Sequence, residues 1–168
     1  LEIKKKFEKL PNNILVVPPD NSISTYKLFE HCNSVITYCT KMGVELTATG
    51  LPVIVCGNGP IRNKKIAIDV SSENEYKKVL DNLPFKEKLK GEKLERAKKY
   101  AYHFFFRKTI QVKSLYEKKH KYPSIGIKNN LFENLNNNKD LTLEKIADQI
   151  INNEEIIYND EDNLWKVS

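Results

Sequence analysis

The sequence predicts an α/β protein in which helices flank a parallel sheet and a mainly helical extension follows. Three observations lead to this fold class. Short β-branched runs alternate with segments of helical periodicity, and loops of a few residues join them. The runs are apolar throughout, as in strands buried on both faces of a sheet. After Pro84 such runs give way to helical periodicity over residues 86–119.

Four strands are predicted. They are "NILVV" (13–17), "SVITYC" (34–39), "PVIVCG" (52–57) and a weaker run, "IAIDV" (66–70). Strands separated by helices and short loops form βαβ units, which bring consecutive strands together in one parallel sheet. We therefore expect the first three strands to be neighbours, with their carboxyl ends at one edge.

The predicted helices cover residues 25–32, 40–50, 71–83, 86–119 and 142–153. Gly50 is a typical residue just past a helix end. A serine followed by acids marks the start of the third helix. Thr142 is a candidate cap for the last helix, and an Asn- and Lys-rich loop precedes it.

This pattern divides the chain into three regions. Residues 1–84 are an α/β lobe, residues 85–128 a basic helical segment packed on it, and residues 129–168 a loop, a helix and an acidic tail. The chain begins at Leu1 and its one methionine is Met42. We therefore expect it to be part of a longer protein.

The formal net charge of +6 is unevenly distributed. Residues 86–128 hold fourteen Lys or Arg and four Glu, whereas residues 129–168 hold three Lys and nine acids. Such asymmetry predicts a basic face for an anionic partner or a basic helix paired with an acidic tail, although solvated helix faces are the commonest cause. The nearby aromatic run "YAYHFFF" could stack on bases, but helical aromatics more often pack internally, so nucleic acid is not an expected partner.

Cysteine usage indicates a reducing compartment. Cys32, Cys39 and Cys56 are odd in number and form no CxxC pair, which favours free thiols. No apolar stretch approaches the ~20 residues of a membrane-spanning helix. We expect a cytoplasmic protein without a metal or cofactor, since the scattered histidines and carboxylates lack metal-ligand spacing.

Small and polar residues follow the predicted strands, where ligands of open α/β sheets bind. The helix that starts at Thr40 presents backbone N–H groups to an anion, and Lys41 adds a charge. Gly43 would let a ligand approach the backbone, and Glu45 could accept hydrogen bonds from a diol. The combination predicts a nucleotide-sugar pocket, with phosphate at the helix start and sugar hydroxyls on the carboxylate.

Each of these residues also has a simpler explanation. Thr40 could serve as a helix cap, and Glu45 could complement the helix dipole, an effect worth about 0.3–1 kcal/mol. Gly43 could permit close helix packing, and Lys41 could be solvated. Asp69, at a strand end, could bind a ligand or cap a turn.

The stretch from residue 18 to residue 57 resembles the C-terminal half of the capsular polysaccharide biosynthesis proteins. These are glycosyltransferase-like proteins of the GT-B type, related to bacterial Kdo transferases. The resemblance extends over residues 13–110. The matching positions are Pro18, Pro19, Ser22, Ser24, Tyr26, Thr37, Tyr38, Gly43, Glu45, Gly50, Pro52, Val53 and Gly57.

The resemblance implies a Rossmann-like donor-binding lobe and a nucleotide-sugar donor. Catalytic residues would lie in an N-terminal lobe, so this chain alone would be inactive. The family's Gly-Ser pair stands here as Cys39-Thr40, and the loop after Gly57 lacks the family's aromatic residue and glycine. The implied donor-binding residues are Ser22, Ser24, Thr40, Lys41, Gly43, Glu45, Arg62 and Lys64.

The expected function is sugar transfer to a glycan or glycolipid acceptor during capsule or surface polysaccharide biosynthesis. Two alternatives stay open: a nucleotide-sugar epimerase of the same fold, and a non-catalytic scaffold lobe in polysaccharide assembly and export. We also expect basic residues after position 85 to contact the anionic inner face of the plasma membrane, while Phe104 and Phe105 pack inward. The basic residues are Lys98, Lys99, Arg107 and Lys108.

Overall fold

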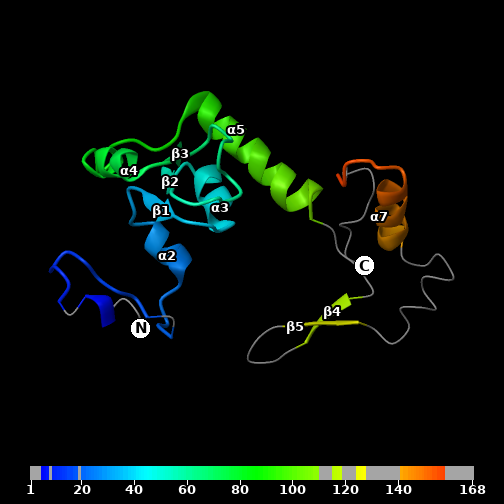
Figure 1. Ribbon diagram of the computed structural model, residues 1–168, viewed down its shortest axis with the longest axis horizontal. Coiled ribbons are helices and arrows are strands. Elements are labelled where there is room, and N and C mark those ends of the chain that lie inside the picture. The colour runs from blue at the N-terminus through cyan, green and yellow to red at the C-terminus, as the bar shows by residue number, and fades with distance from the viewer. Residues whose placement is uncertain are drawn as a thin grey trace. The chain divides into compact units, whose positions relative to one another are not determined.

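The computed structural model describes residues 5–7, 9–18, 20–109, 115–118, 124–127 and 141–157. It divides into two compact units, residues 1–32 and residues 33–168. The first unit contains the short helix α2 (Thr25–Phe29), which falls within the helix expected at 25–32. The second unit contains the parallel sheet and its helices (Figure 1).

A three-stranded parallel sheet lies at the centre of the second unit. Its strands, in spatial order, are β1 (Val35–Thr37), β2 (Val53–Val55) and β3 (Ile68–Asp69). All three residues of β2 are fully buried, because this strand has a neighbour on each side. The α/β prediction, with a parallel sheet and flanking helices, is therefore confirmed.

The register of the sheet assigns side chains to its two faces. Ile36, Ile54 and Ile68 are paired across the strands, so their side chains share one face. Thr37 and Val55 are also paired and point to the opposite face. The helices α3 (Met42–Ala48) and α4 (Glu73–Leu80) lie on opposite sides of the strands (Figure 1).

The helix α3 connects β1 to β2 and falls within the predicted helix at 40–50. It buries Val44, Leu46 and Thr47. Gly50 follows the helix with a φ of 88°, a left-handed conformation that costs glycine little. This residue lets the chain leave the helix and turn directly into β2.

The helix α4 starts as the sequence predicts. Ser72 Oγ accepts a hydrogen bond from the Glu75 N–H at 3.2 Å, and the Glu75 carboxylate accepts one from the Ser71 N–H at 2.8 Å. These reciprocal bonds resemble a capping box and satisfy donors that a helix start leaves unpaired. They fix the direction in which the chain leaves β3.

The helix α5 (Gly91–Tyr102) packs on α3 and continues into a π-helical turn, η1 (His103–Arg107). Ala97, on its inner side, is fully buried. Further along, β4 (Leu115–Lys118) pairs antiparallel with β5 (Ser124–Ile127). The helix predicted over 86–119 is therefore wrong at 86–90, which precede the helix start at Gly91, and at 115–118, where pairing with the run "SIGI" outweighs helical periodicity.

The last described helix is α7 (Leu141–Ile151), which agrees with the prediction of a helix at 142–153. Its expected cap is not confirmed. Thr142 lies inside the helix and is buried, with 3% of its surface exposed. A threonine whose side chain packs inward is better explained by burial than by capping. The tail beyond residue 157 lies outside the described residues.

The strand predicted at 13–17 is wrong. Residues 14–18 form neither helix nor strand, and Leu15 is 86% exposed. The Ile14 N–H donates to the Pro11 carbonyl, and the Asn21 N–H donates to the Pro18 carbonyl. β-Branched residues form a strand only where a neighbour pairs with them and packing covers them. The parallel sheet consequently consists of the later three predicted strands.

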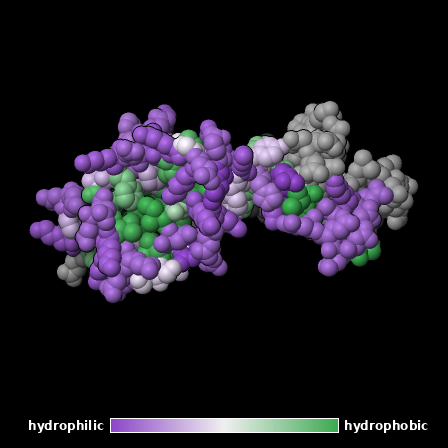
Figure 2. All heavy atoms as spheres, turned by 90° about the horizontal axis from the view of Figure 1, so that it is seen from above, coloured by the Kyte–Doolittle hydropathy of each residue, from purple (hydrophilic) through white to green (hydrophobic). Residues whose placement is uncertain are grey.

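The visible surface is mostly hydrophilic, but a patch of apolar residues at the left of the view is enclosed by hydrophilic ones, and a smaller apolar group lies at the right (Figure 2). Monomeric proteins commonly carry such a patch, and it often marks a contact surface. No helix in the described ranges is long and apolar enough to cross a membrane.

Candidate ligand site at the carboxyl edge of the sheet

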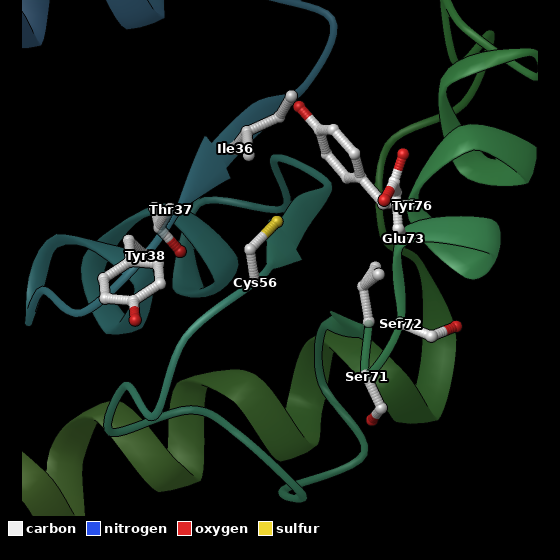
Figure 3. Close-up of a pocket in the computed structure, with 9 residues that line it drawn as sticks. Ile36, Thr37, Tyr38, Cys56, Ser71, Ser72, Glu73 and Tyr76 are labelled. Carbon is white, nitrogen blue, oxygen red and sulfur yellow. The ribbon is translucent and has the colours of Figure 1, made fainter.

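A pocket of about 540 Å³ opens where the parallel strands end. Its lining combines the ends of β1, β2 and β3 with the first turn of α4 (Figure 3). Carboxyl ends of parallel strands are where ligands bind in open α/β sheets. The lining residues are Ile36, Thr37, Tyr38, Cys56, Val70, Ser71, Ser72, Glu73 and Tyr76.

The pocket is chemically mixed. The Tyr76 ring reaches from α4 toward Ile36, and the Cys56 sulfur points into the space between β1 and α4 (Figure 3). Among the described residues of the lining there is no lysine or arginine, and the one charged group is the Glu73 carboxylate. Lys77 Nζ lies 2.7 Å from that carboxylate, in an exposed pair. Apolar walls with hydroxyl and carboxylate acceptors suit a sugar ring or a base better than a phosphate.

Arg62 stabilises this edge by hydrogen bonds to the strand ends. Its Nη1 donates to the Val55, Gly57 and Val70 carbonyls at 3.2–3.4 Å, and its Nη2 donates to the Val70 carbonyl and to Ser71 Oγ at 3.2 and 2.9 Å. One guanidinium therefore ties the end of β2 to the end of β3 and fixes a serine of the pocket lining. The family resemblance implied that Arg62 binds the donor, whereas in the structure its guanidinium N–H groups donate to acceptors of the protein itself.

Lys64, the other implied donor-binding residue of the same loop, lies beside α5. Its Nζ is 5.6 Å from the centre of the Tyr100 ring, within cation–π range. The Tyr100 hydroxyl donates to the Pro60 carbonyl at 2.6 Å. Burial raises the pKa of the Tyr100 phenol above its ordinary value, and the nearby Lys108 opposes that rise. These contacts hold the loop between β2 and β3 against α5.

The turn between β1 and α3 and the first turn of α3 together contain four of the expected donor-binding residues. Thr40 Oγ1 accepts a hydrogen bond from the Met42 N–H at 3.2 Å, so this hydroxyl supports the helix start. Lys41 is exposed, and Glu45 is partly buried in the first turn of α3. Because α3 has only seven residues, its dipole gives a weaker anion site than the sequence analysis assumed.

Gly43, the fourth of these residues, is explained by packing. A Cβ at this position would lie 2.7 Å from Ile61 Cδ1 and 3.3 Å from Ile61 Cγ1. Ile61 is 1% exposed, so its side chain has little space into which it could move. The glycine thus lets α3 approach the β2–β3 loop, as the simpler explanation proposed.

The exits of β1 and β2 are in close contact. A Cβ on Gly57 would overlap the Tyr38 carbonyl, and Cys39 Sγ lies 3.5 Å from the Asn58 carbonyl. This close approach explains the glycine that the family resemblance includes. It also brings the Thr40 turn next to the loop that contains Arg62.

The expected donor-binding residues come from three segments of the chain. Thr40, Lys41, Gly43 and Glu45 share one turn and helix, whereas Arg62 and Lys64 lie in the β2–β3 loop. Ser22 and Ser24 belong to the first unit, where both are exposed and Ser24 precedes α2 without a side-chain cap bond. None of these eight residues lines the pocket.

The sequence analysis missed the contribution of α4 to this edge. Ser71, Ser72, Glu73 and Tyr76 line the pocket, and all follow the fourth predicted strand. Their sequence, "SSENEY", was interpreted only as a helix start. The signal that could have identified them is the position of that run at a strand exit in a parallel sheet.

Comparison of the chain with protein-family models, with curated proteins and with solved structures found no match. The resemblance to capsular polysaccharide proteins therefore remains a prediction from the residues. Within the described part of the chain, no group of three or more His, Cys, Asp or Glu side chains could hold a metal ion.

Proposed function

We propose that this chain is the donor-binding lobe of a GT-B-type glycosyltransferase in capsule or surface polysaccharide biosynthesis. In this function the carboxyl edge of the sheet holds a nucleotide-activated sugar. The observation that supports it best is the meeting of three parallel strand ends at a pocket of about 540 Å³. Thr37, Tyr38 and Gly57, which match the family pattern, lie at this same edge.

The donor would divide its contacts between the pocket and the adjacent turns. Its uncharged rings suit the pocket, where Tyr38 and Tyr76 offer aromatic surface and hydroxyl groups. Its phosphates suit the Thr40–Lys41 turn, which lies beside the pocket and carries a positive charge. Glu45 would accept hydrogen bonds from hydroxyls of the ribose or the sugar.

Isothermal titration of the chain and of the full-length protein with nucleotides and nucleotide sugars tests this function. We expect binding that depends on the nucleotide base, and weaker binding by about 1.5–3 kcal/mol in Glu45→Gln, the usual value of a hydrogen bond to a charged group. Glu92→Gln is the matched control, because Glu92 lies on α5 and pairs with Arg96 at 2.8 Å. It should bind like the unmodified protein.

Two results would contradict the proposal. One is the absence of binding for any nucleotide or nucleotide sugar in the full-length protein. The other is a Glu45→Gln variant that melts at a lower temperature but binds the donor normally. The second result would identify Glu45 as a partner of the helix dipole.

One observation favours the alternative of a non-catalytic scaffold lobe. The family resemblance implies that Arg62 binds the donor. In the structure, its guanidinium N–H groups donate to four acceptors of the protein itself. A scaffold lobe needs this edge only as a rigid surface. The titration separates the two functions, because a scaffold would not select among nucleotide bases.

A further inference from the structure

A second hollow region lies at the amino edge of the sheet, at the opposite ends of the same strands. Two adjoining hollows of about 480 Å³ each share Ile68, Phe85 and Lys86. Pro52, directly before β2, also lines one of them. We call this surface the lysine groove and define it by the lining residues Pro52, Ile68, Val79, Asn82, Pro84, Phe85, Lys86, Glu87, Lys88, Leu89, Lys90 and Lys93.

The lysine groove combines an apolar floor with a basic rim. Phe85 and Leu89 are partly buried, whereas Lys86, Lys88 and Lys90 between and beside them are exposed. Lys93, in the first turn of α5, adds a fourth ammonium group. The one acid of the lining, Glu87, lies 3.3 Å from Lys90. With four lysines and one glutamate, the lining has a net charge of +3.

We propose that the lysine groove is a docking surface for an anionic phospholipid bilayer. The floor would contact the upper acyl chains while the lysine stems lie along apolar surface and their ammonium groups meet lipid phosphates. Several exposed basic residues near an anionic leaflet are each attracted to its surface potential. The lipid would occupy the amino edge, so the pocket at the carboxyl edge stays open to water.

The composition of the rim favours a membrane over an acidic protein partner. The four cations are all lysines, which act as hydrated point charges on long stems. Recognition of a particular carboxylate is more often achieved by the planar fork of arginine. The groove is also wide and open, and it has an apolar floor that a purely electrostatic contact would not need.

The groove also fits a membrane better than the outer face of α5, where the sequence analysis expected the contact. On α5, Lys98 lies 3.3 Å from Glu95 and Arg96 lies 2.8 Å from Glu92. Lys108, after η1, lies 3.1 Å from Glu155. Acids therefore accompany the cations along that helix, whereas the lysine groove has one acid for four lysines.

Co-sedimentation of the full chain with phosphatidylcholine vesicles, with and without phosphatidylglycerol, tests the proposal. The triple variant Lys86→Gln, Lys88→Gln, Lys93→Gln should lose on the order of 100-fold in affinity for the anionic vesicles at low salt, because each lysine contributes about a factor of 5 there. The charge-matched control is Lys78→Gln, Lys98→Gln, Lys99→Gln, which includes two outward lysines of α5. It should lose less than about 3-fold.

A variant and a second measurement separate the membrane from other partners. Phe85→Ala leaves the net charge unchanged. It should nevertheless bind anionic vesicles more weakly than the unmodified protein, because it loses apolar contact with the lipid. Hydrogen exchange of the unmodified protein should show vesicle-dependent protection at residues 84–93, without requiring any variant to fold. The circular dichroism spectrum establishes that each variant keeps its secondary structure.

Four results would overturn the proposal. Equal losses in the two triple variants would mean that net charge alone drives binding, and a larger loss in the control would place the contact on α4 or α5 instead of the groove. Tight binding to poly-glutamate that Phe85→Ala leaves unchanged would identify an acidic protein partner instead. Recovery of the unmodified protein equally with both vesicle types would exclude the bilayer.

Discussion

The two edges of one small sheet differ in chemistry. At the carboxyl edge, the pocket is lined by two tyrosines, two serines, a threonine, a cysteine and a single carboxylate. At the amino edge, four lysines surround an apolar floor. The carboxyl edge is braced by Arg62, whereas the lysines of the amino edge are exposed and one of them pairs with Glu87.

This difference separates two physical tasks. A braced, largely neutral pocket can hold a ligand in a defined position, because its shape is fixed before the ligand arrives. A ring of exposed lysines attracts any anionic surface but selects little, because point charges in water act over a Debye length. We therefore propose recognition at the carboxyl edge and association at the amino edge.

The largest expected effect comes from removing the brace. Arg62→Ala removes the printed donor of the Gly57 and Val70 carbonyls, whereas the Val55 carbonyl keeps its bond from the Val70 N–H, and each unsatisfied buried group costs about 1–3 kcal/mol. We expect the free energy of unfolding to fall by about 3 kcal/mol or more, measured by urea denaturation. Lys64→Ala, in the same loop, should cost less than about 1 kcal/mol because it loses one exposed cation–π contact. Unchanged stability with lost nucleotide binding in Arg62→Ala would instead make Arg62 a ligand residue.

A smaller effect is expected where α3 packs on the β2–β3 loop. Gly43→Ala forces its Cβ against Ile61 and should destabilise by about 1–3 kcal/mol, the usual cost of overpacking. Ile61→Val removes the methyl group that the new Cβ would meet. In a double-mutant cycle, the combined variant should be more stable than the sum of the two single effects. Strict additivity would show that Gly43 is required for some other reason.

The hydrogen bond between the Tyr100 hydroxyl and the Pro60 carbonyl should contribute about 1 kcal/mol to stability, as single hydrogen bonds do, and Tyr100→Phe should lose it.

The raised pKa of Tyr100 also predicts that the stability of the protein depends on pH. A phenol whose pKa is higher in the folded state than in the unfolded state stabilises the fold below the unfolded value, near 10, and this contribution disappears as the pH rises through the folded value. Between neutral and alkaline pH, the free energy of unfolding should therefore fall less steeply with pH in Tyr100→Phe than in the unmodified protein. Parallel curves for the two proteins would exclude a titrating Tyr100.

The smallest effect on stability is expected at the amino edge. Lys86→Gln and Lys88→Gln change exposed side chains, and such substitutions usually alter the free energy of unfolding by less than about 0.5 kcal/mol. Urea denaturation of these variants and of Arg62→Ala compares directly how much free energy of unfolding is lost at each edge. A loss above about 1 kcal/mol would mean that these lysines brace the fold.

Two apolar runs show why part of the fold could be predicted and part could not. "PVIVCG" and "NILVV" have similar composition, yet Val53, Ile54 and Val55 are fully buried while Leu15 is 86% exposed. Local patterns identified the helix start at Ser72 and the glycine past α3, because caps and left-handed turns depend on neighbouring residues. Strand formation depends on partners far away in the sequence, which composition does not reveal.

The candidate site follows the same rule. The edge of the sheet could be predicted, because carboxyl ends of parallel strands meet there whatever residues they carry. The role of Arg62 could not, because its acceptors are backbone carbonyls of two strands, and carbonyls are present at every position. A basic residue in a loop has the same appearance in a sequence whether it binds a phosphate or its own chain.

The most direct test of the central claim maps a nucleotide sugar onto the two edges by backbone amide chemical shifts. We expect nucleotide sugars to shift the amides of residues 37–45, 56–59 and 70–76, while residues 84–93 stay unchanged. The effect should depend on the nucleotide base. Shifts confined to residues 84–93, or shifts that inorganic phosphate reproduces in full, would contradict a recognition site at the carboxyl edge.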